Sequence, residues 1–124
     1  QDLAESPQVV FTEPLDYPDF VAAMNRSLFI ISDSGGVQEE ASALKKPLLI
    51  LREVSERPEA ISKGTGILVG TVREKIVKEA LALFEDAEYR NSFAARETPF
   101  GDGHASERIR DIMVNYLQAT IGGA

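Results

Sequence analysis

The hydrophobic positions of the chain form short unbroken runs in its first part and helical stripes in its second. The runs lie at residues 28–31, 48–51 and 67–69, and a weaker one lies at residues 9–11. Runs that do not alternate with polar residues are typical of strands covered on both faces of a parallel sheet. Apolar positions with helical spacing lie between them, and strands that alternate with short helices indicate βαβ units. The pattern therefore predicts an α/β fold.

The second half of the sequence is predominantly helical. Amphipathic stripes predict helices at residues 74–84, 87–95 and 105–119. One proline and two glycines within residues 98–104 predict a loop before the last helix. An apolar stripe of this kind is more often core than a partner surface. In the last helix it consists of Ile109, Ile112, Met113, Tyr116 and Leu117.

Composition narrows the classes of protein that fit this pattern. The 124 residues predict a single domain over residues 1–124, and a formal net charge of −7 disfavours nucleic-acid polymers as partners. The absence of cysteine excludes disulfides, thiolate zinc sites and cysteine nucleophiles. No apolar run approaches about 18 residues, so we expect a soluble, cytoplasmic protein that does not bind membranes. The sequence begins at Gln1 rather than Met, and we expect a segment of a longer protein.

The strongest chemical signal is the turn formed by Ser34, Gly35 and Gly36, between a predicted strand and a predicted helix. Two glycines permit positive φ and leave the backbone open to a ligand, and the first N–H groups of a helix attract anions. With Gly36 as the N-cap, Glu39 would occupy position N3 and support the cap, and Glu40 would lie one turn below the glycines. A carboxylate there can accept hydrogen bonds from a ribose diol. The alternative is a tight strand-to-helix turn without a ligand.

Arg57 is a second candidate, directly after the strand predicted at residues 48–51. Pro58 fits the first position of a helix, so Arg57 is expected at a helix entrance, where a guanidinium can contact a pyrophosphate. The alternative is a surface ion pair with Glu56 or Glu59, worth about 0–1 kcal/mol.

With these features in place, the sequence resembles the bacterial non-hydrolysing UDP-N-acetylglucosamine 2-epimerases. The matching segments follow the family's order and cover nearly the whole chain. They are residues 13–17 (EPLDY), 33–41 (DSGGVQEEA), 46–47 (KP), 56–60 (ERPEA), 64–65 (GT), 68–71 (LVGT) and 100–103 (FGDG), with Ala105 and Arg108.

The resemblance implies a Rossmann-like parallel sheet flanked by helices, as part of the C-terminal domain of a GT-B fold. It assigns the diphosphate of UDP to Ser34, Gly35 and Gly36, the ribose to Glu40, and the phosphate side of the nucleotide to Arg57. Phe20 and the loop near Leu15 would border the uracil. No cofactor or metal is implied, and the expected ligands are UDP and UDP-GlcNAc.

The resemblance also implies that the acid and base residues lie outside this chain. The family interconverts UDP-GlcNAc and UDP-ManNAc, and its catalytic carboxylates belong to an N-terminal domain that is absent here. The single histidine, His104, is expected to be an exposed loop residue, so no catalytic residue is assigned to this chain and we expect it to be inactive alone. Two alternatives remain: a stand-alone UDP-sugar-binding or regulatory module, and a hydrolysing relative. Without its partner domain, the last helix is expected to expose its stripe and to drive self-association into a homodimer.

Overall fold

The fold is built on a three-stranded parallel sheet. A computed structural model describes residues 5–121. The strands β1 (Ile30–Ser32), β2 (Leu48–Ile50) and β3 (Gly66–Leu68) lie in the order β1-β2-β3. Each strand pairs with its neighbour in parallel, with Ile31 beside Leu49 and Leu49 beside Ile67. The α/β fold with a parallel sheet is confirmed, and all three strands lie within two residues of their predicted positions.

The helices also follow the predicted pattern closely. Along the chain they are α1 (Tyr17–Arg26), α2 (Gly35–Ala43), α3 (Pro58–Ser62), α4 (Arg73–Glu85), α5 (Ala87–Ser92), the 3₁₀ turn η2 (Phe93–Ala95) and α6 (Ala105–Ile121). Asp16 and Asp86 cap α1 and α5 by accepting hydrogen bonds from the backbone N–H groups three residues later. The helix predicted at residues 87–95 is thus an α-helix that tightens into a 3₁₀ turn at its end.

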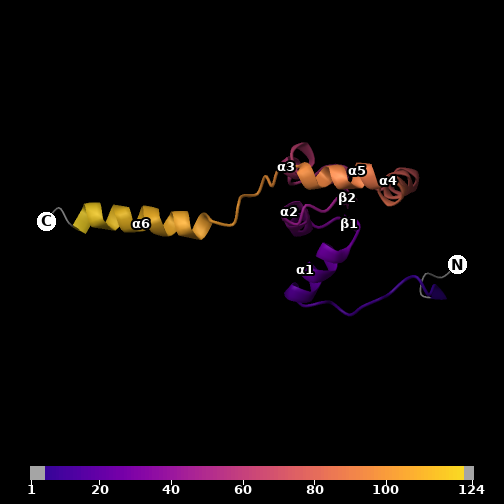
Figure 1. Cartoon of the computed structure of the whole chain (residues 1–124), viewed down its shortest axis with the longest axis horizontal. Helices are drawn as coiled ribbons and strands as arrows, with labels where there is room; N and C mark the ends of the chain where they lie inside the picture. The colour runs from indigo at the N-terminus through magenta and orange to yellow at the C-terminus, as the bar shows by residue number, and fades with distance from the viewer. Residues whose placement is uncertain (1–4, 122–124) are drawn as a thin grey trace.

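Helices cover both faces of the sheet, which explains why the strands have no polar side (Figure 1). On one face, Leu48 and Ile50 pack with Met24 of α1 and with Val37 and Ala41 of α2. On the other face, the central residue of β2, Leu49, packs in a cluster with residues of α4 and η2. That cluster consists of Leu49, Val69, Leu83 and Phe93, all fully buried.

The strand predicted at residues 9–11 is wrong. These residues have no regular structure, and the side chains of Val10 and Phe11 are 82% and 69% exposed. Figure 1 shows this part of the chain as an extended trace that leads to α1 away from the sheet. A strand needs a neighbour to satisfy its backbone N–H and C=O groups, and none of the described strands pairs with this segment.

The last helix, α6, has no contact with the core. It extends away from the sheet and the other helices in Figure 1, and none of its residues is buried. The interpretation of its apolar stripe as core is therefore wrong, and the expectation of an exposed stripe is confirmed: Ile112 and Tyr116 are 68% and 69% exposed. Gly101 and Gly103, both with positive φ, lie in the predicted loop that separates α6 from the rest of the chain.

Candidate functional site

The start of α2 is the centre of the candidate site. Strand β1 ends at Ser32 and α2 begins three residues later, with Ser34 as the N-cap. The N-cap is thus not Gly36, and Glu39 lies two residues beyond position N3 rather than at it. The Ser34 side chain makes no capping hydrogen bond. The first N–H groups of α2 therefore keep the donor capacity and the positive dipole end that bind anions.

Gly35 and Gly36 form the first turn of α2 with an ordinary backbone. Neither has positive φ, so the turn does not use the backbone freedom that glycine permits. A Cβ on Gly36 would lie 3.9 Å from Ser34 Oγ, and a Cβ on Gly35 would lie 3.6 Å from Glu56 Oε2. Both are ordinary contact distances, so the fold itself tolerates a side chain at either position. The missing Cβ atoms instead leave room for a ligand to approach the backbone amides.

The faces of α2 separate its structural residues from its accessible ones. Val37, Gln38, Ala41 and Ser42 are buried, whereas Glu40 is half-buried and lies on the same helix face as Gly36, four residues earlier. Among residues 5–121, the ion pairs engage the Glu39 carboxylate but not that of Glu40. The Glu40 carboxylate thus lies one helical turn below Gly36 with none of these ion pairs.

Arg57 lies at a helix entrance, as predicted, because it is the N-cap of α3 and Pro58 occupies the first helical position. The alternative of a surface ion pair with Glu56 or Glu59 is wrong, because the carboxylate partner is Glu39. The Arg57 Nε donates to Glu39 Oε1 of α2 at 2.6 Å, and Nη1 donates to the Glu56 carbonyl at 3.2 Å. The hydrogen bond and the charge of Glu39 raise the pKa of Arg57 above its ordinary value. Since these bonds occupy Nε and Nη1, Nη2 is left to contact a ligand.

A partly buried hydrogen-bond chain fixes the Arg57 loop to α2. The Ser55 hydroxyl donates to Gln38 Oε1 at 2.6 Å and accepts from the Arg57 backbone N–H at 2.9 Å. Gln38 is fully buried, so water cannot readily replace this bond. The sequence reasoning missed these positioning residues. The available signal was a glutamine between the apolar positions Val37 and Ala41, where a buried polar side chain needs a partner.

Phe20 lies in α1 rather than at the glycine turn itself. It is half-buried and packs against the core cluster that includes Val37 from the first turn of α2. Leu15, in the segment before α1, is 44% exposed. The structure therefore brings Ser34, Gly35, Gly36, Glu40 and Arg57 to α2 and its start, whereas Phe20 packs against the core cluster beneath α2.

A separate depression of about 380 Å³ lies at the opposite ends of the strands. It is lined by residues that precede β1 and β2, including Asn25, Leu28 and Lys46, and by residues of α5 and η2. None of the predicted site residues lines it. Ligands of open α/β sheets bind beyond the carboxyl ends of the strands. We therefore place the site at the α2 turn.

The described residues contain neither a cluster of metal ligands nor a membrane-spanning helix. Within residues 5–121, no three His, Asp or Glu residues are grouped closely enough to hold a metal ion. No helix in the same part of the chain is long and apolar enough to cross a membrane.

Comparison with known proteins shows what this arrangement resembles. A family model described as UDP-N-acetylglucosamine 2-epimerase matches residues 1–114. A UDP-N-acetylglucosamine 2-epimerase from Campylobacter jejuni is 42% identical over 106 residues, which are 86% of this chain and 28% of that protein. The chain thus spans less than a third of the length of this relative.

Solved structures give the same result. The chain superposes on a putative UDP-N-acetylglucosamine 2-epimerase from Listeria monocytogenes with a TM-score of 0.87 and 39% identity, over 94% of this chain and 32% of the other. It superposes on the enzyme from Neisseria meningitidis bound to UDP-GlcNAc with a TM-score of 0.78 and 44% identity, over 84% of this chain and 28% of the other. These neighbours confirm the predicted fold class. The chain therefore belongs to the UDP-N-acetylglucosamine 2-epimerase family.

Proposed function

We propose that this chain supplies the UDP-binding side of an enzyme that interconverts UDP-GlcNAc and UDP-ManNAc. The observation that supports this most directly is the start of α2, where uncapped N–H groups lie beneath two glycines that the fold does not require. The same turn lies within the part of the chain that matches a relative solved with UDP-GlcNAc bound.

Each predicted residue has a role that its position supports. The N–H groups of Gly35 and Gly36, with the Ser34 hydroxyl, bind the diphosphate, because the helix dipole and the free donors both favour an anion there. Glu40 accepts hydrogen bonds from the two ribose hydroxyls, one helical turn below. Arg57 donates its Nη2 group to a phosphate oxygen, and Phe20 borders the uracil.

The chemical step needs groups that this chain does not supply at the turn. Epimerisation beside an acetamido group requires a general base and a general acid placed on the reacting carbon. We assign these to a further domain, which is consistent with relatives that are about three times as long as this chain. We expect the 124-residue chain alone to bind UDP without converting UDP-GlcNAc. A cytoplasmic location and a homodimer remain predictions.

Calorimetric titration of the 124-residue chain with UDP tests the site. We expect Glu40→Ala and Arg57→Ala each to weaken binding about tenfold, because each removes a hydrogen bond to a charged group. Glu85→Ala is the control, since Glu85 ends α4 and is exposed. UDP binding that is unchanged in both site variants would overturn the assignment. Conversion of UDP-GlcNAc by this chain alone would overturn the claim that the chemistry lies elsewhere.

A further inference from the structure

A carboxylate with no role in the proposed site lies beside the diphosphate-binding turn. Glu56 Oε2 is 3.6 Å from the position that a Cβ on Gly35 would occupy. The other carboxylate oxygen, Oε1, accepts a hydrogen bond from Arg52 Nη1 at 3.1 Å. The Glu56 side chain is 68% exposed. A negative charge thus lies next to the amides that attract anions.

Carboxylates partly neutralise the charges of the two arginines near the turn. Arg52 pairs with Glu56 itself, and Arg57 pairs with Glu39 at 2.6 Å. Each arginine near the turn therefore already has a carboxylate partner, and Glu40 adds a further negative charge one helical turn away. The attraction for an anion comes from the backbone amides, the helix dipole and the Nη2 group of Arg57. Glu56 Oε2, the oxygen that does not bond to Arg52, opposes it.

We propose that Glu56 makes this site selective for a nucleoside diphosphate whose outer phosphate is capped by a sugar, over free nucleoside di- and triphosphates. The inference rests on the proposed binding of UDP at the α2 turn. A capped diphosphate carries one charge per phosphate, whereas a free terminal phosphate loses a second proton near pH 6. UDP therefore carries about one more negative charge than UDP-GlcNAc at neutral pH, and UTP about two more. Each added charge is repelled by the Glu56 carboxylate.

The test compares the dissociation constants of UDP-GlcNAc, UDP and UTP in low salt with EDTA, so that no metal neutralises the phosphates. We expect Glu56→Gln to tighten UDP binding about two- to fivefold, the range for an exposed charge pair. The affinity for UTP should increase more than that for UDP, and the affinity for UDP-GlcNAc should increase less. The ratio of the affinity for UDP-GlcNAc to that for UDP should therefore fall. The gain should shrink in high salt, because screening weakens the repulsion.

Two matched variants separate charge from structure. Arg52→Gln breaks the same ion pair but removes a positive charge, so it should weaken UDP binding while Glu56→Gln strengthens it. A purely structural role of the pair would move both variants in the same direction and would overturn the proposal. Glu85→Gln changes the net charge equally at a distant exposed site and should leave the ratio of UDP to UDP-GlcNAc affinity unchanged.

The possible failures are distinguishable. If the wild-type chain binds none of the three nucleotides, or binds them equally well after Glu40→Ala and Arg57→Ala, the proposed site falls and this inference falls with it. If binding depends on Glu40 and Arg57 but the affinity ratio is unchanged by Glu56→Gln, only the selectivity role of Glu56 is wrong.

Discussion

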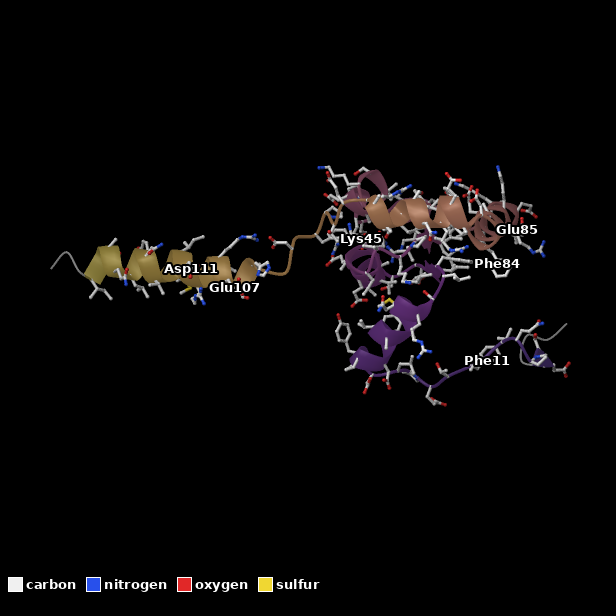
Figure 2. All side chains as sticks on the ribbon, in the orientation of Figure 1. Phe11, Lys45, Phe84, Glu85, Glu107 and Asp111 are labelled. Atoms are coloured by element: carbon white, nitrogen blue, oxygen red, sulfur yellow. The ribbon has the colours of Figure 1, made fainter. Side chains whose placement is uncertain are left out.

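Helices α4 and α6 carry the same kind of amphipathic pattern but have opposite environments. In α4, Ile76, Ala80 and Leu83 pack against the sheet, and Leu83 is fully buried. In α6 the corresponding stripe is exposed along its whole length. Figure 2 shows the side chains of this helix, among them the labelled acidic residues Glu107 and Asp111, away from the other elements. Periodicity thus predicts which face of a helix is apolar. It does not predict what covers that face, because the covering surface can belong to residues outside the chain.

The largest expected effect is on the free energy of unfolding, when a buried leucine of the sheet and an exposed leucine of α6 are each replaced by alanine. Leu49 is fully buried in the central strand, whereas Leu117 of α6 is 48% exposed. We expect Leu49→Ala to lower the free energy of unfolding by about 2–5 kcal/mol through lost burial and a cavity. Leu117→Ala should change it by less than about 0.5 kcal/mol. Urea denaturation followed by circular dichroism measures both, and equal losses would mean that α6 packs against the core in solution.

Within the sheet region, Gly36→Ala tests whether this glycine matters for UDP affinity or for the stability of the fold. Its Cβ would meet only Ser34 Oγ, at 3.9 Å, and alanine is the better helix former by up to about 1 kcal/mol. Stability should therefore stay the same or rise. UDP binding should weaken by about tenfold or more, because the new methyl group lies where the diphosphate approaches the amides. A variant that loses stability and keeps UDP affinity would show that this glycine serves the fold.

Much of the sheet and of the candidate site could be predicted from the sequence, because local sequence signals determine where the strands and helices begin. Pro58 placed Arg57 at the start of α3, and the three unbroken apolar runs located the strands. The partner of Arg57 could not be predicted, because the contact with Glu39 joins residues that are 18 positions apart and depends on how α2 packs. The run at residues 9–11 was mistaken for a strand for a similar reason, since strand formation depends on a neighbour that no local pattern specifies.

A smaller effect on stability and UDP affinity is expected from a change at Ser55, which fixes the Arg57 loop to α2. Ser55→Ala removes the hydroxyl that joins Gln38 to the Arg57 backbone and leaves a buried amide oxygen without this donor. We expect a loss of stability of about 1 kcal/mol and a several-fold loss of UDP affinity, because Arg57 is no longer held in place. Ser55→Thr keeps the hydroxyl and should restore both. The control is Ser92→Ala, whose hydroxyl bonds only within exposed α5 and should leave UDP affinity unchanged.

The smallest effect concerns the start of α6, the other region of the comparison. The Arg108 guanidinium, followed by the His104 backbone N–H, holds the pKa of Asp102 below its ordinary value. Because the folded-state pKa is lowered, the contact supports α6 above the unfolded-state pKa and is lost as the pH falls through the folded-state value. Acidification to about pH 3 should therefore speed amide hydrogen exchange near Arg108 relative to the intrinsic rate, while Asp102→Asn should remove that pH dependence. Leu49 should keep its protection in both proteins. An Asp102→Asn variant with unchanged pH dependence would show that another group controls the start of α6.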